Sequence, residues 1–217
     1  MTTDLTRHPH LPETPFVKAV WAESYDFTTD RIVMGDTSSE SGMPWPKNDA
    51  DLAAFREETR DHVLVMGSTT YDHLPPHMKL PSSTKERPII ILTSRITEYI
   101  HKTTGLLAVQ PLNPTGTIEH GVMLQWLQKW PEFAGKKIAV IGGARVIDAF
   151  KPYYDEMVVT WHPGRHYPSA DVGAPRTSIF DGFIATDDTK ELDTVQLPEN
   201  NLPRSIRLTR FTRKENA

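Results

Sequence analysis

A carboxylate and an aromatic ring stand four residues apart in this sequence, at Asp51 and Phe55. Asn48 is a favourable helix N-cap, and the pattern that follows predicts a helix over residues 48–60 with Asp51 in its first turn. Residues four apart share one face of a helix. The carboxylate could therefore accept two hydrogen bonds from a flat, amidine-bearing heterocycle while the ring packs on its plane. Taken alone, the pair is explained better by the attraction of Asp51 to the positive end of the helix.

Two apolar stretches run directly into glycine and then into a predicted helix. Residues 137–141 precede Gly142 and Gly143, and residues 63–66 precede Gly67. Glycine lets a backbone approach a ligand without a Cβ collision, and the free N–H groups at a helix start attract phosphate. Each turn by itself is more simply an ordinary link from strand to helix, and the GxGxxG fingerprint is absent. Two such turns in one sheet suit a pyrophosphate that lies across the strand ends.

A third polar group follows the apolar residues 89–92. Thr93, Ser94 and Arg95 offer two hydroxyls and a guanidinium, a set that could hold an exposed phosphomonoester such as the 2′-phosphate of NADP. The start of a polar loop accounts for the same residues equally well.

These groups need a scaffold that brings several strand ends together, and the apolar pattern predicts one. Buried strands alternate with helices, which is typical of a mostly parallel sheet with helices on both faces. We predict a single α/β domain whose C-terminal edge strand is antiparallel. The predicted strands span 16–22, 32–35, 63–66, 89–93, 106–109, 137–141, 157–161, 179–185 and 205–212, and the other helices span 68–74 (capped by Ser68), 117–130 and 144–150. Ligands of such sheets bind at the carboxyl ends of the strands, where the groups above lie.

The composition narrows the class of protein. The chain has 217 residues and a net charge of −4, so it lacks the basic excess that nucleic-acid binding requires. It has no cysteine, which excludes disulfides and thiolate metal sites, and we assign no metal to its histidines, placing His162 and His166 in a loop. No apolar run could cross a membrane, and residues 1–15 are typical of a flexible tail rather than a secretory signal. We expect a soluble cytoplasmic monomer with one domain over residues 16–217.

The motifs are more specific as an ordered set along the chain than any of them is alone. They are Val20-Trp21-Ala22, Met43-Pro44-Trp45 followed by Asp51-Leu52 and Phe55, Val65-Met66-Gly67 with Thr70, Arg87 ahead of residues 89–94, Ile141-Gly142-Gly143-Ala144, and Thr160. In this order and spacing the sequence resembles the dihydrofolate reductases over residues 16–212. The resemblance implies reduction of 7,8-dihydrofolate to tetrahydrofolate by NADPH, with hydride transfer from nicotinamide C4 to pterin C6, in support of one-carbon and thymidylate metabolism.

The resemblance also implies roles for single residues. Asp51 would hold the pterin N3 and 2-amino group, and Thr160 would bond Asp51 directly or through water. The segment with Met43 and Trp45 would close over the nicotinamide, and Arg87 would clamp the glutamate α-carboxylate. Further substrate contacts would come from Ala22, Leu52, Phe55 and Ile141. NADPH would lie on Gly67, Ser68, Thr69, Thr70, Thr93, Ser94, Arg95, Gly142, Gly143, Ala144, Arg145 and Val146, with a cis peptide between the two adjacent glycines.

Departures from the family pattern keep two alternatives open. Many members carry a basic residue where this chain has Ser68, and a tyrosine where it has Ile147. A reductase of a ribosylaminopyrimidine phosphate, from riboflavin synthesis, would share the glycine turns, although Asp51 would repel its phosphate. A non-catalytic pteridine-binding protein on the same scaffold is the other alternative. We assign no role to residues 1–15, 36–42 or 75–86.

Overall fold

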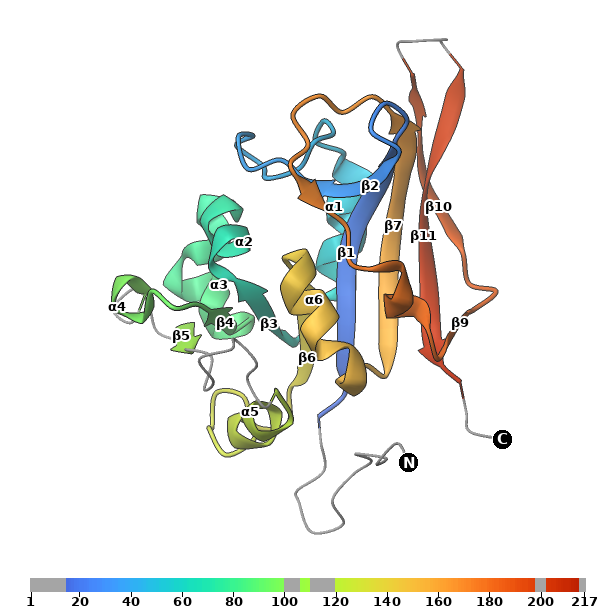
Figure 1. Cartoon of the computed structure of the whole chain (residues 1–217). Helices are drawn as coiled ribbons and strands as arrows, with labels where there is room; N and C mark the ends of the chain where they lie inside the picture. The colour runs from blue at the N-terminus through green and yellow to red at the C-terminus, as the bar shows by residue number, and fades with distance from the viewer. Residues whose placement is uncertain (1–14, 100–105, 110–119, 198–201, 215–217) are drawn as a thin grey trace.

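The computed structural model describes residues 15–99, 106–109, 120–197 and 202–214. Within them the chain forms one sheet in the order β10-β11-β7-β1-β6-β3-β4-β5, to which β2, β8 and β9 attach (Figure 1). The strands are β1 (Val17–Asp26), β2 (Arg31–Gly35), β3 (His62–Gly67), β4 (Ile89–Leu92), β5 (Leu106–Val109), β6 (Lys137–Gly142), β7 (Glu156–Arg165), β8 (Val172–Gly173), β9 (Phe183–Ala185), β10 (Lys190–Gln196) and β11 (Pro203–Arg213). The helices are α1 (Asp49–Glu58), α2 (Ser68–His73), α3 (Pro81–Glu86), α4 (Ile96–Tyr99), α5 (His120–Leu127) and α6 (Ala144–Phe150), with 3₁₀ turns η1 (Pro76–Lys79), η2 (Lys151–Tyr153) and η3 (Thr177–Phe180).

The run of neighbouring strands from β7 to β5 is parallel throughout. Strand β11 adds to β7 in the antiparallel direction, and β10 adds to β11 in the same way. This arrangement confirms the predicted α/β sheet with an antiparallel C-terminal edge. It also brings the carboxyl ends of β1, β3, β4, β6 and β7 to one side of the sheet, where ligands of such sheets bind.

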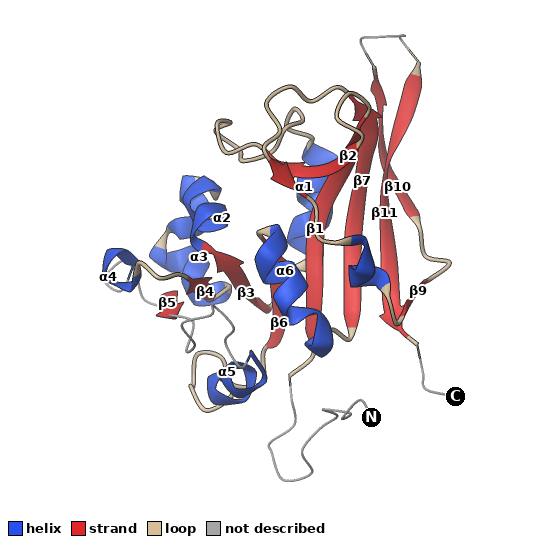
Figure 2. Ribbon diagram, in the orientation of Figure 1, coloured by secondary structure: helices blue, strands red, loops and turns tan. Residues whose placement is uncertain are grey.

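Side chains along the central strands alternate between two apolar cores, as the pleat of a strand requires. In β3, Val63 and Val65 join the core that contains α5 and α6, whereas Leu64 and Met66 join the core that contains residues of α1, α2 and α4. Figure 2 shows α1 behind β1 and α6 in front of it. The prediction of helices on both faces is therefore confirmed, and β3, β4 and β6 are mostly apolar because both of their faces are covered.

Several strand boundaries differ from the prediction. β1 continues to Asp26 and β7 to Arg165, because the two strands pair far beyond the predicted ends, with Ser24 opposite His162. The predicted strand over residues 179–185 begins as the 3₁₀ turn η3, and its remainder, β9, pairs with β11. β8 and β10 were not predicted. The sequence of β10 lacks the apolar alternation that indicates a strand, and most of its side chains are exposed in the structure.

Two helix ends were also predicted wrongly. Gly67, not Ser68, is the N-cap of α2, and no side chain caps this helix. Helix α5 ends at Leu127 rather than at residue 130, because the residue before a proline avoids helical geometry and the N–H of Trp130 instead closes a turn to the Leu127 carbonyl. The predicted start of this helix, residues 117–119, and residues 1–14 of the predicted tail lie outside the described residues.

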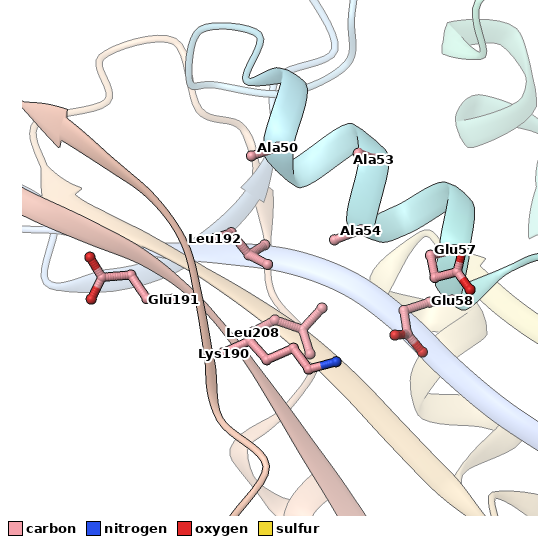
Figure 3. A pocket seen from close by; sticks show the side chains of 9 residues that line it. All are labelled: Ala50, Ala53, Ala54, Glu57, Glu58, Lys190, Glu191, Leu192 and Leu208. Carbon is pink, nitrogen blue, oxygen red and sulfur yellow. The ribbon is translucent and has the colours of Figure 1, made fainter.

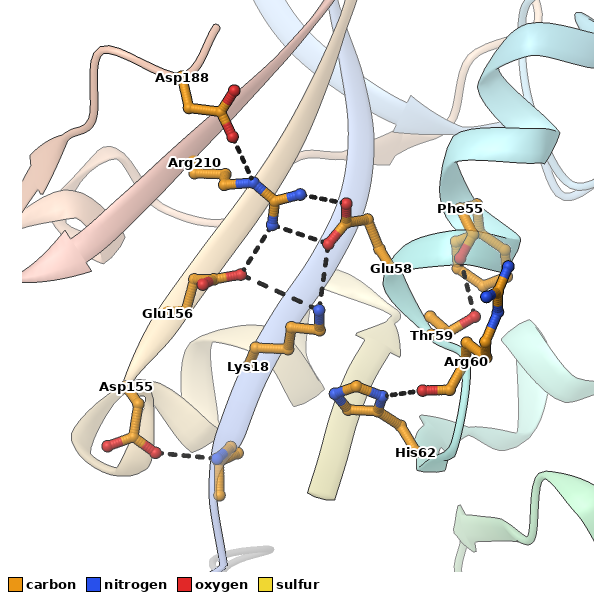
Figure 4. Close-up of polar contacts among 11 residues, drawn as sticks. Lys18, Phe55, Glu58, Thr59, Arg60, His62, Asp155, Glu156, Asp188 and Arg210 are labelled. Carbon is orange, nitrogen blue, oxygen red and sulfur yellow. Dashed lines mark hydrogen bonds and ion pairs between the residues drawn. The ribbon is translucent and has the colours of Figure 1, made fainter. Parts of the chain in front are cut away.

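The C-terminal end of α1 is tied to the sheet by a cluster of ion pairs (Figure 4). Lys18 Nζ lies 3.1 Å from Glu58 Oε2, and Arg210 binds the same carboxylate with two nitrogens. Arg210 also lies 3.1 Å from Glu156 Oε1 and 3.1 Å from Asp188 Oδ2. Burial alone would raise the pKa of Glu58, but the hydrogen bonds from Arg210 and Lys18 outweigh it and lower that pKa. These contacts hold α1 at a fixed place against β1, β7 and β11.

Candidate active site

Asp51 lies in the first turn of α1, and its side chain is buried. Asp51 as a whole is 6% exposed. Asn48 Oδ1 accepts a hydrogen bond from the Asp51 N–H at 2.9 Å, so the predicted N-cap is confirmed and the start of the helix is fixed. Since the other end of α1 is anchored through Glu58, the helix holds the Asp51 carboxylate in a defined position.

The hydrogen-bond partner of the Asp51 carboxylate is His162 on β7. His162 Nε2 lies 3.1 Å from Asp51 Oδ2, and the two side chains are only 4% and 8% exposed. Thr160 was expected to bond Asp51 directly or through water, and among the described residues it makes no direct hydrogen bond to that carboxylate. Thr160 is itself buried and stands two positions before His162, on the same face of the strand.

Sequence reasoning missed His162 because it placed this residue in a loop. That placement was wrong, since β7 continues to Arg165. The signal that could have found it is the period of two along a strand: if Thr160 faces Asp51, His162 faces the same side.

Trp45 lies against the other side of His162. The two rings are stacked with their centroids 4.3 Å apart and an angle of 16° between their planes. Trp45 is 4% exposed and belongs to a small apolar cluster with Val33 and Tyr167, against which Ala22 and Met43 pack. The Met43–Trp45 segment thus lies next to the Asp51–His162 pair. Its indole N–H is a buried hydrogen-bond donor without a partner among the described residues.

The predicted substrate contacts fall on the same side of the sheet. Ile141, at the end of β6, is buried in the core on the α1 side, and the half-buried Phe55 packs against that core. Leu52 is half-buried next to Asp51 in α1. These apolar side chains supply the flat, dry surroundings that an aromatic heterocycle requires.

Arg87 stands at the end of α3 and reaches toward α1. Its Nη1 donates to Thr59 Oγ1 at 3.4 Å, and its backbone N–H bonds the Ser83 carbonyl at 2.9 Å. Burial lowers the pKa of the Arg87 guanidinium, and the nearby Glu86 partly offsets that effect. The group stays charged at any working pH, and Thr59 engages only one of its five N–H donors.

The two glycine turns meet at the carboxyl ends of β3 and β6. The peptide between Gly142 and Gly143 is cis, as the resemblance implied. A Cβ built on Gly142 would lie 3.0 Å from Thr70 Oγ1, and one built on Gly67 would lie 3.8 Å from the Gly143 nitrogen. Gly142 also has a φ of +146°, which side chains rarely adopt. The turns therefore form one cradle of backbone and hydroxyl groups, which Ser68, Thr69, Ala144, Arg145 and Val146 flank at the starts of α2 and α6.

The third predicted polar group lies at the end of β4. Thr93 is buried, and its Oγ1 accepts a hydrogen bond from the Arg95 N–H at 3.0 Å. The Arg95 side chain is half exposed and pairs with Glu98 at 3.0 Å and with Asp72 of α2 at 3.5 Å. The guanidinium is therefore positioned beside α2 by contacts that solvent weakens. Ile147, where the family often has tyrosine, is fully buried in the core on the α6 side.

A separate groove of about 580 Å³ lies between α1 and the β10–β11 hairpin (Figure 3). Its floor is apolar, formed by three alanines of α1 with Leu192 and Leu208, and its rim carries Glu57, Glu58, Lys190 and Glu191. None of the predicted site residues lines it. The groove and the predicted site therefore use different residues of α1.

No helix among the described residues is long and apolar enough to cross a membrane.

Comparison with known proteins gives a consistent result. The sequence profile of the family "Dihydrofolate reductase" matches residues 27–194. Dihydrofolate reductase type 8 of Escherichia coli is 28% identical over 114 residues, which cover 52% of this chain and 58% of that enzyme. Dihydrofolate reductase of Mycoplasma pneumoniae is 27% identical over 150 residues, or 69% of this chain and 78% of the relative.

Among solved structures, dihydrofolate reductase from Enterococcus faecalis complexed with NADP(H) and RAB-propyl superposes with a TM-score of 0.60 at 22% identity. The match covers 93% of this chain and 98% of that one, and it shows that the fold is shared. The alignment with the type 8 enzymes spans little more than half of their length, but the family profile matches most of the present chain. The chain therefore belongs to the dihydrofolate reductase family.

Proposed function

We propose that this protein reduces 7,8-dihydrofolate to tetrahydrofolate with NADPH as the hydride donor. The observation that carries the proposal is the buried Asp51 carboxylate, held by α1 on the side of the sheet where Ile141 leads into the glycine cradle. Membership of the dihydrofolate reductase family supports the same reaction.

The glycine cradle fits a dinucleotide. A side chain at Gly142 would collide with Thr70, so the close approach of the two turns depends on bare backbone, which a pyrophosphate can contact. We assign the pyrophosphate to Gly67, Thr70 and Gly143, and the 2′-phosphate to Arg95. The exposed ion pairs of Arg95 are weak enough to be exchanged for a phosphate. NADPH supplies a hydride when it is bound.

On the substrate side, Asp51 accepts hydrogen bonds from the pterin N3 and 2-amino groups, and Phe55 and Ile141 pack on the ring. Arg87 binds the carboxylate of the glutamate tail with donors that Thr59 leaves available. Trp45 covers the Asp51–His162 pair and keeps bulk water away from it. Water supplies the proton that N5 takes up, and the negative charge of Asp51 favours that protonation.

The alternative substrate, a ribosylaminopyrimidine phosphate, fits less well. A carboxylate as buried as Asp51 would repel a phosphate placed beside it. A protein that binds pteridine without reducing it would have the same site, so turnover decides between that alternative and the proposal.

We also propose that the protein is a cytoplasmic monomer. The lack of cysteine is compatible with a reducing compartment. Light scattering on the purified chain measures the mass, and a dimer would overturn this part of the proposal.

The test of the reaction is the loss of NADPH absorbance with purified protein and 7,8-dihydrofolate, beside an NADH reaction. Asp51→Asn should fold and bind NADPH but lose activity on the order of tenfold to a hundredfold, since a hydrogen bond to a charged group is lost. Asp49→Asn is the matched control, because Asp49 lies in the same turn of α1 with its side chain 87% exposed. Turnover that persists in Asp51→Asn would refute the site. A folded wild-type protein with no turnover would refute the reaction.

A further inference from the structure

His162 is a buried ionisable group that the proposed reaction does not use. It lies on β7 between Asp51, 3.1 Å from its Nε2, and the stacked ring of Trp45. Its backbone is fixed as well, because Ser24 Oγ on β1 donates to the His162 carbonyl at 3.1 Å. The imidazole therefore has little freedom to move, and its position restricts the orientation of the Asp51 carboxylate.

The chemistry of the pair defines the direction of the hydrogen bond. When the Asp51 carboxylate is ionised it only accepts hydrogen bonds, so His162 Nε2 carries the hydrogen and donates a hydrogen bond to Asp51 Oδ2. Two carboxylate oxygens offer about four lone-pair positions. The histidine takes one of them, and the remaining positions are enough for a ligand that donates two N–H groups in one plane.

Most side-chain hydrogen bonds in proteins go to the backbone or to water. Here the N–H is directed at the carboxylate that the proposed substrate needs, and the ring also packs on the Met43–Trp45 segment through Trp45. One imidazole thus contacts both the group that binds the ligand and the segment expected to close over the site.

We propose that His162 is the positioning residue of Asp51: its Nε2–H fixes the plane of the carboxylate so that an amidine-bearing ring can bind with two parallel hydrogen bonds, while Trp45 holds the imidazole in place. This inference rests on the proposed function. It concerns the binding of the pterin-like ring and leaves the binding of NADPH unchanged.

Two variants separate the two roles of the histidine. His162→Phe keeps a flat ring to stack on Trp45 but removes the N–H donor. His162→Gln loses the ring but places an N–H near the position of Nε2. The exposed His166 provides the matched control, His166→Gln, since it lies four residues away and contacts Asp26 at 3.6 Å rather than Asp51.

The measurements are the KM and kcat for dihydrofolate, the Kd for a 2,4-diaminopyrimidine whose protonation is visible in its ultraviolet spectrum, and the Kd for NADPH. His162→Phe should weaken the diaminopyrimidine and raise the KM about tenfold to a hundredfold, the usual effect of losing a hydrogen bond to a charged group. The NADPH Kd should stay within about twofold, as expected for a distant site. His162→Gln should recover a large part of the loss, and His166→Gln should behave as the wild type.

Nuclear magnetic resonance of ¹⁵N-labelled histidine gives a readout that needs neither turnover nor folding of a His162 variant. The wild type should show a protonated, exchange-protected Nε2 at His162, and Asp51→Asn should change that resonance. A wild type that reduces dihydrofolate while His162→Phe keeps full diaminopyrimidine affinity would refute the positioning role alone. A wild type without turnover, in which the resonance and the diaminopyrimidine respond as stated, would refute the proposed reaction and leave the positioning role standing.

Discussion

The hydrogen-bond partners of Asp51 and Arg87 determine what each of these two side chains can still bind. Each lies on the α1 side of the sheet and is held by one side-chain partner: Asp51 by the His162 imidazole and Arg87 by the Thr59 hydroxyl. A single partner leaves further hydrogen-bonding positions on both groups, which the proposed function assigns to the amidine of the ring and the carboxylate of the tail.

The role of Arg87 can be tested by a change that keeps its charge. Arg87→Lys should raise the KM for dihydrofolate by about tenfold and lower kcat less, because a lysine cannot form the planar, two-pronged contact with a carboxylate. Steady-state kinetics at saturating NADPH measures both constants. Arg56→Lys, on the exposed side of α1, is the control, and an unchanged KM in Arg87→Lys would remove Arg87 from the substrate site.

At the scale of elements, the site depends on how strands end. β3 and β6 both end in glycine, and the two turns approach each other closely enough that Thr70 fills the space a Cβ would need at Gly142. The helices that follow are short, and neither α2 nor α6 has a side-chain cap. In the proposed function their first N–H groups bind the phosphates of the dinucleotide, in place of the missing side-chain caps.

Gly142→Ala tests this arrangement. The new methyl group would meet Thr70 Oγ1 at 3.0 Å and adopt a φ of +146°, so we expect a loss of unfolding free energy of about 1–3 kcal/mol together with weaker NADPH binding. Urea unfolding and NADPH fluorescence titration measure the two effects. Gly135→Ala is the control, since it has a positive φ but nothing within 4 Å of its Cβ. It should lose stability without losing NADPH affinity; equal losses of affinity in both variants would contradict the cradle.

At the scale of the whole molecule, the ion pairs around Arg210 join segments that are far apart in the chain. Glu58 ends α1, Lys18 lies on β1, and Arg210 lies on β11. They hold the helix that carries Asp51 against the sheet on the face opposite α6. The stability of the fold and the position of the Asp51 carboxylate therefore depend on the same cluster.

Arg210→Met should lower the free energy of unfolding by about 2 kcal/mol at neutral pH, somewhat less than loss of a partner in a fully buried pair, because Lys18 still pairs with Glu58. The pKa of Glu58 is lowered in the folded state, so its contribution is complete above its ordinary pKa and is lost as the pH falls through the lowered one. The difference between wild type and variant should therefore shrink on acidification. Urea unfolding at several pH values measures it, with the exposed Arg207→Met on the same strand as control. A difference that stays constant with pH would contradict the assignment to Glu58.

Local sequence determined much of this protein. The Asn48 cap, the apolar strands that end in glycine and the order of the motifs were all readable, because capping, alternation and turn formation depend on residues within a few positions of one another. Those features were enough to predict the α/β sheet, the helix that carries Asp51 and the family. They placed the ends of β1 and β7 too early, since polar side chains such as Ser24 and His162 are buried there only through pairing of the two strands.

The tertiary structure decided which side chains meet. His162 and Asp51 lie 111 positions apart, and Glu58 and Arg210 lie 152 apart, so no local pattern encodes either contact. β10 forms because β11 offers an unpaired edge, not because its own sequence alternates. The sequence by itself specified the elements and the residues able to do chemistry. The packing of β7 beneath α1 selected His162, rather than Thr160, as the direct partner of Asp51, because hydrogen bonds between distant segments depend on strand register and helix position.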